Sequence, residues 1–69
     1  MTNSTERLTH AERSCLQSVA RGESPDTLAE QFGDDQETIS KHLASARRKL
    51  LAATTIEAVA RALKMGLIE

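Results

Sequence analysis

The sequence predicts an all-α fold of four packed helices. The first observation is composition, because 39% of the residues are hydrophobic but only Phe32 is aromatic. A core of Leu, Ile, Val and Ala suits packed helices better than a sheet. The second is that these apolar residues recur at helical spacing between cap residues. With 69 residues, we expect a flexible lead-in at 1–7 and one small domain at 8–69.

The first two helices are expected at about 10–21 and 25–32. Each begins after a residue that can accept hydrogen bonds from free backbone N–H groups, and each ends at a Gly that can adopt a left-handed conformation. The start signals are a capping box of Thr9 with Glu12 and the pair Ser24-Pro25, and the stops are Gly22 and Gly33.

The third helix is expected at about 36–50, after a cap at Asp35 or Asp34. Its predicted core stripe is Ile39, Leu43, Ala46 and Leu50. A short helix, a tight turn containing Gly33 and a longer helix together form the outline of a helix-turn-helix. In such a motif the second helix lies in the major groove of DNA.

This geometry predicts two sets of contacts to double-stranded DNA. The outward residues near the start of the third helix would meet base edges, namely Glu37, Ser40, Lys41 and Ala44. Hydroxyl groups and long cationic side chains can donate hydrogen bonds to phosphate oxygens. The predicted phosphate contacts are Thr38, Arg47, Arg48 and Lys49.

The fourth helix is expected at about 55–65, with a second capping box formed by Thr54 and Glu57. Its predicted core stripe is Ile56, Val59, Ala60 and Leu63. A second apolar line would then face outward, formed by Ala58, Ala62 and Met65. A helix that is apolar on two sides is normally covered on both. We therefore predict a homodimer in which this second line is the interface.

Charge is unevenly distributed along the chain. Residues 23–37 carry six acidic residues and no basic one, whereas residues 38–50 carry four basic residues and no acidic one. The acidic stretch has three interpretations. Its negative charge can stabilise helix N-termini through the helix dipole. It can also bind a basic partner such as another regulator or RNA polymerase, or weaken non-specific DNA binding.

The chain resembles the LuxR-type DNA-binding domain, also called the GerE or FixJ/NarL type. The matching residues are Leu8-Thr9, Glu12, Leu16, Gly22, Ser24, Leu28-Ala29, Phe32-Gly33, Thr38-Ile39, His42-Leu43, Ala46, Lys49-Leu50, Glu57-Ala58-Val59-Ala60 and Gly66-Leu67-Ile68. The resemblance implies a bacterial transcription regulator whose third helix reads DNA and whose fourth helix forms the dimer contact. By position it assigns base reading to Ser40, Lys41 and Ala44, and a backbone contact to Thr38.

Four positions depart from the usual pattern of that family. Glu37 stands where Lys or Arg is common, Asp34 where a small apolar residue is usual, Leu51 where Gly is common, and Thr55 where Arg or Lys is frequent. Each change opposes positive charge near the expected DNA surface or alters a cap. A carboxylate can still accept a hydrogen bond from the amino group of cytosine.

We therefore expect a sequence-specific, dimeric DNA-binding transcription regulator. The alternative is a protein-interaction module of the same fold, an anti-activator or heterodimer partner with little DNA binding. A relative of sigma-factor region four is a third possibility, against which the complete fourth helix argues.

Other classes of function find no support in the sequence. No catalytic group, cofactor site or metal-ligand set is recognisable, so an enzyme is not expected. With one cysteine and no membrane segment, we expect a cytoplasmic, nucleoid-associated protein.

Overall fold

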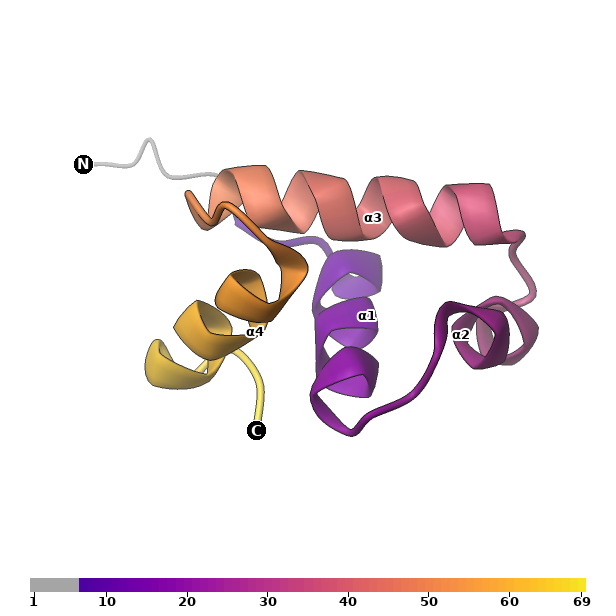
Figure 1. Ribbon diagram of the computed structural model, residues 1–69, viewed down its shortest axis with the longest axis horizontal. Helices are drawn as coiled ribbons and strands as arrows, with labels where there is room; N and C mark the ends of the chain where they lie inside the picture. Colours follow the sequence, from indigo (N-terminus) through magenta and orange to yellow (C-terminus); the bar gives the residue numbers. More distant parts are fainter. Residues whose placement is uncertain (1–6) are drawn as a thin grey trace.

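The computed structural model describes residues 7–69. The expected lead-in at residues 1–7 therefore lies outside the described residues, except for Arg7. The described part forms four helices and no strand, which confirms the all-α fold (Figure 1). The helices are α1 (His10–Ala20), α2 (Pro25–Phe32), α3 (Gln36–Lys49) and α4 (Thr55–Lys64).

Side-chain caps start all four helices. At α1 the Thr9 hydroxyl accepts from the Glu12 backbone N–H at 3.1 Å, and the Glu12 carboxylate accepts from the Thr9 N–H at 2.9 Å. This is the predicted capping box. At α4 only half of the predicted box forms. The Thr54 hydroxyl accepts from the Glu57 backbone N–H at 3.0 Å. The Glu57 carboxylate, however, accepts from the backbone N–H of Ala53 at 2.8 Å and not from that of Thr54.

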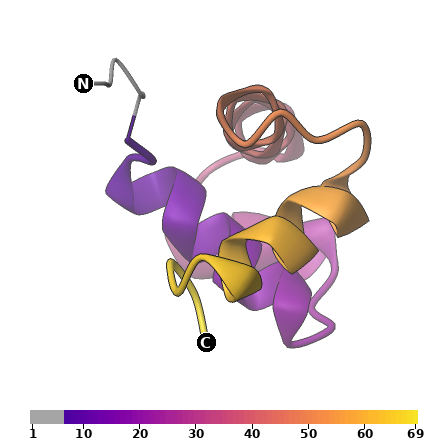
Figure 2. The same ribbon diagram turned by 90° about the vertical axis from the view of Figure 1, so that its left-hand side faces the viewer.

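The helices are arranged around α1 and α3. In Figure 1, α3 runs along one side of the molecule, α1 packs beneath its middle, and α2 and α4 lie at opposite ends. Figure 2 views the molecule from the α4 end, with α3 seen end-on above α1 and α4. This arrangement leaves one long side of α3 free of contact with the other helices.

Two hydrophobic clusters hold α3 in this position. The larger cluster lies between α1, α3 and α4 and contains Leu8, Leu16, Ala46, Leu50, Ala58, Val59, Ala62 and Ile68. The smaller one lies between α1, α2 and α3 and contains Cys15, Leu28 and Ile39. Val19 and Leu43 pack against both clusters. The long helix is therefore supported by packing on either side of its centre.

The core side of α4 differs from the one predicted. Ala58 and Ala62 are fully buried against α1 and α3, so the prediction that they lie on an outward line is wrong. Ile56, Ala60 and Leu63, which were predicted to be core, are exposed, and only Val59 of that stripe is buried. Small side chains allow α4 to approach its neighbours closely, so the alanines and not the larger residues face inward.

Candidate nucleic-acid interface

The turn between α2 and α3 sets the direction of α3. Gly33 has a φ of 71°, a left-handed conformation that ends α2 and that glycine adopts without steric penalty. Two residues later the Asp35 carboxylate caps α3 by accepting from the Thr38 N–H at 2.8 Å. A side-chain contact between Gln36 and Asp26 also joins the start of α3 to the start of α2. These contacts fix the orientation of α3 relative to α2 on both sides of the turn.

The free side of α3 is a continuous surface, which we call the outer face. Its residues are all exposed: Glu37, Ser40, Lys41, Ala44 and Arg48. At about 100° per residue these positions lie on the side of the helix opposite Ile39 and Leu50, which are buried. The four predicted base-reading residues therefore share one surface, together with Arg48 from the predicted phosphate set.

The outer face carries small side chains between longer charged ones. Ser40 and Ala44 are short, whereas Glu37 and Lys41 project into solvent with 79% and 76% of their side-chain surfaces exposed. The Lys41 ammonium lies 4.0 Å from the Glu37 carboxylate, one helical turn away. An exposed pair of this kind contributes little to stability, so both groups are available to a ligand.

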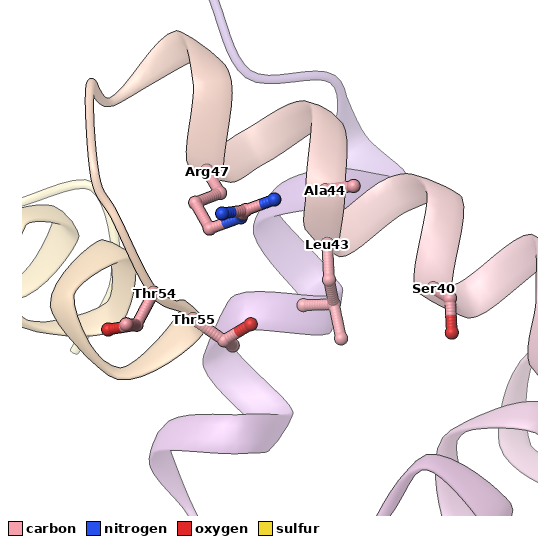
Figure 3. A pocket seen from close by; sticks show the side chains of 6 residues that line it. All are labelled: Ser40, Leu43, Ala44, Arg47, Thr54 and Thr55. Carbon is pink, nitrogen blue, oxygen red and sulfur yellow. The ribbon is translucent and has the colours of Figure 1, made fainter.

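A hollow of about 330 Å³ separates α3 from the start of α4 (Figure 3). Its lining residues are Ser40, Leu43, Ala44, Arg47, Thr54 and Thr55. Figure 3 shows the half-buried Arg47 side chain on the wall of this hollow, and its guanidinium donates to the Ala53 carbonyl at 2.9 Å. Arg47 therefore lies beside the outer face, with part of its donor capacity used by the loop before α4.

Lys49 lies on the opposite flank of α3 and is only 15% exposed. Its ammonium lies 2.9 Å from a carboxylate oxygen of Glu12 and donates to the Arg7 carbonyl at 3.1 Å. We therefore remove Lys49 from the predicted phosphate set, because its charge is held in an internal ion pair with α1. The sequence does not predict this pair, since no local pattern links residues so far apart in the chain.

The ion pair with Lys49 changes the acidity of Glu12. Burial alone raises the pKa of this carboxyl. The opposite effect is larger, and it comes from hydrogen bonds with Ser45, Lys49 and the Thr9 backbone and from the charge of Lys49. The net result is a pKa lowered from 4.5 to about 2. Glu12 is therefore ionised at neutral pH although it is buried.

Thr38 lies at the N-terminal end of α3 and is half-buried. Its backbone N–H, and next its hydroxyl, hydrogen-bond to the Asp35 carboxyl and lower the pKa of that group. Both groups of Thr38 thus stabilise the helix start, and the side chain remains partly accessible beside the outer face.

The sequence profile of one family matches most of the chain. This family is described as "Bacterial regulatory proteins, luxR family", and the match covers residues 6–62. The chain belongs to the luxR family. A solved structure, "Structure of Transcription factor, GerE", superposes with a TM-score of 0.86 at 24% identity, covering 90% of this chain and 92% of that one. No protein with a curated description matches significantly.

Membership of the luxR family makes this chain a DNA-binding domain of a transcription regulator. The GerE structure shows the same four-helix fold. This family and fold belong to DNA-binding regulators, which are not a class of enzymes.

The luxR-family domain departs from regular backbone geometry at Leu51. This residue ends the turn after α3 with a φ of 56°, a left-handed conformation unusual for a side chain branched beyond Cβ, and 83% of it is exposed. Two backbone hydrogen bonds close this turn, from Leu51 N–H to the Arg48 carbonyl and from Ala52 N–H to the Arg47 carbonyl. The turn that joins α3 to α4 is therefore made by a strained residue.

Residues 7–69 of this luxR-family domain contain neither a metal-ligand cluster nor a membrane-spanning helix. No group of three or more His, Cys, Asp and Glu side chains within this range is placed to hold a metal ion. None of the helices described in it is long and apolar enough to cross a membrane.

Proposed function

We propose that this domain binds a specific double-stranded DNA sequence by inserting the outer face of α3 into the major groove. The observation that carries the proposal is the free side of α3, which holds exposed polar side chains on a helix whose opposite side is fixed by two hydrophobic clusters. A rigid helix of this kind can present base-reading groups in a defined register.

In this proposal Glu37, Ser40, Lys41 and Ala44 meet base edges. Ser40 and Ala44 are short, so the α3 backbone can approach the floor of the groove without steric hindrance between the longer side chains. Lys41 donates to guanine or to other acceptors, Ser40 pairs with either kind of group, and the Ala44 methyl suits the methyl group of thymine. The remaining contacts are made to the phosphates that border the groove.

Three residues serve as phosphate contacts in this proposal. Arg48 is exposed on the outer face, Arg47 lines the hollow beside it, and Thr38 lies at the N-terminus of α3. With Lys49 engaged by Glu12, the cations available near the groove are few. Binding by one domain should therefore be weak, and its dependence on salt should reflect only these few phosphate contacts.

A homodimer would compensate for weak binding by one domain. We propose that its interface is the exposed apolar stripe of α4, formed by Ile56, Ala60 and Leu63, in place of Ala58 and Ala62. Ile56 is 72% exposed and Leu63 is 45% exposed, which is unusual for side chains of this size. Met65, which is 61% exposed, follows the helix and lies at the edge of this surface. Two domains joined this way would bind two half-sites.

The proposal is tested by selecting DNA from a random pool and measuring the affinity of the selected site over a series of salt concentrations. Lys41→Ala should reduce binding to the selected site by roughly tenfold while leaving non-specific binding nearly unchanged. Arg48→Ala should weaken binding to all sequences and lower the salt slope by about 1.

Arg21→Ala is the matched control, because Arg21 is an exposed cation at the C-terminal end of α1, away from α3. If all three variants bind like the wild type, α3 is not the DNA-binding element.

The second candidate is a protein-interaction module that retains the fold. The observation in its favour is the charge of the interface, where Glu37 lies beside Lys41 and exposed Asp34 and Asp35 precede α3. This acidic segment would then contact a basic surface of another regulator or of RNA polymerase. Absence of DNA binding at low salt by a folded protein would support this function over the first.

A further inference from the structure

Glu37 and Lys41 form an acceptor and a donor that act side by side on the outer face of α3. Their charged atoms lie 4.0 Å apart, and each side chain is more than three-quarters exposed. Within residues 7–69, neither makes another ion pair, and no side-chain hydrogen bond holds either one in place. Both groups can therefore exchange their mutual contact for contacts with bases at little energetic expense.

The two groups differ in what they can bind. A carboxylate only accepts hydrogen bonds, and an ammonium only donates them. In the major groove, guanine presents the acceptors O6 and N7, and cytosine presents the amino donor N4. A C·G base pair thus offers one partner to each side chain.

An A·T pair is a poorer match for the same two groups. The amino group of adenine lies between two acceptors, N7 of the same base and O4 of thymine, and both repel a carboxylate. The amino group of cytosine has only guanine O6 beside it on the groove edge, and Lys41 would neutralise that acceptor.

The distance between the groups also fits a single base pair. Guanine O6 and cytosine N4 are hydrogen-bonded to each other, so they lie about 3 Å apart. The 4.0 Å between the Lys41 and Glu37 groups is close to this separation. Ser40, the outer-face residue between them in sequence, is short and does not obstruct this approach.

We propose that Glu37 and Lys41 together read one C·G base pair of the half-site, with Glu37 accepting from the cytosine amino group and Lys41 donating to guanine. This inference rests on the proposed function, because it requires α3 in the major groove. It makes Glu37 a specificity-determining residue, although its charge opposes that of the phosphates.

The test is selection from a random DNA pool by three proteins: the wild type, Glu37→Gln and Asp34→Asn. Wild type should select C at one position of the half-site and bind it about tenfold more tightly than A there. Glutamine pairs with adenine through N6 and N7, so Glu37→Gln should select A at that position and leave the other positions unchanged. Asp34→Asn removes one exposed negative charge next to α3 without altering the outer face, and it should select the wild-type sequence.

Two results would overturn the inference, and they are distinguishable. If Glu37→Gln selects the wild-type sequence and binds every DNA more tightly by the same factor as Asp34→Asn, Glu37 acts only by repelling phosphates. The proposed function then stands and the base assignment fails. If the folded wild type binds no DNA even at low salt, the proposed function fails and the base assignment fails with it.

Discussion

The ammonium of Lys49 lies 2.9 Å from the carboxylate of Glu12, although 37 positions separate the two residues in the chain. Glu12 belongs to the first turn of α1 and also completes its capping box with Thr9. Lys49 is the last residue of α3. One carboxylate therefore starts α1 and also fastens the end of α3 to it.

Replacing Lys49 by Met should lower the free energy of unfolding by about 3 kcal/mol, because it leaves the buried carboxylate of Glu12 without its counter-charge. Urea denaturation followed by circular dichroism measures this change. Arg48→Met is the matched control, since Arg48 is exposed and the change there should stay within about 0.5 kcal/mol. Equal effects of the two substitutions would show that the ion pair contributes nothing specific.

Stability should fall in acid more steeply for the wild type than for Glu12→Gln. The pKa of Glu12 is lowered from 4.5 to about 2 in the folded protein. A carboxyl group whose pKa is lower in the folded state stabilises the protein at pH values above its pKa in the unfolded state. This stabilisation is lost as the pH falls through the pKa of the folded state. The contribution amounts to roughly 3 kcal/mol and should disappear between about pH 5 and pH 2.

Unfolding free energies of both proteins measured across this pH range test the assignment. The difference between wild type and Glu12→Gln should shrink steadily as the pH falls. A difference that stays constant with pH would mean that Glu12 has the same pKa in the folded and unfolded states.

Leu51→Gly should stabilise the domain by about 1 kcal/mol, because Leu51 holds a left-handed backbone conformation that only Gly adopts without strain. Little packing is lost, since Leu51 is 83% exposed. Thermal unfolding should show a midpoint about 4–8 °C higher. Ala53→Gly is the control in the same loop, where φ is not positive, and it should not raise the midpoint. A lower midpoint for Leu51→Gly would refute the strain at this turn.

Substitutions on the two sides of α4 should have opposite consequences. Ile56→Glu, on the exposed side, should weaken self-association by at least roughly tenfold while the monomer stays folded. Ala58→Glu, on the buried side, should unfold the domain because it places an unpaired charge in the core. Sedimentation measures the first effect and circular dichroism the second. A wild type that is monomeric at high concentration would exclude the dimer.

The sequence predicts the part of the candidate interface that lies on one helix. The positions of Glu37, Ser40, Lys41 and Ala44 on a common exposed side follow from the helical repeat and from a stripe of apolar residues opposite them. The positions of the cations that flank this side do not follow from the helical repeat, because they depend on contacts with other helices and loops. Arg47 and Lys49 are near neighbours in sequence, yet one borders the hollow next to α4 and the other pairs with α1.

The sequence by itself determined the four helices and the turn before α3, because caps and glycine stops act between residues within a few positions of each other. Only the tertiary structure decided which side of α4 faces the core, since both sides of this helix are apolar and the choice depends on how closely α1 and α3 approach. Ala58 and Ala62 were buried by that approach, and Ile56 and Leu63 were left exposed. The same long-range packing brought Lys49 to Glu12, a contact that no local pattern in the chain encodes.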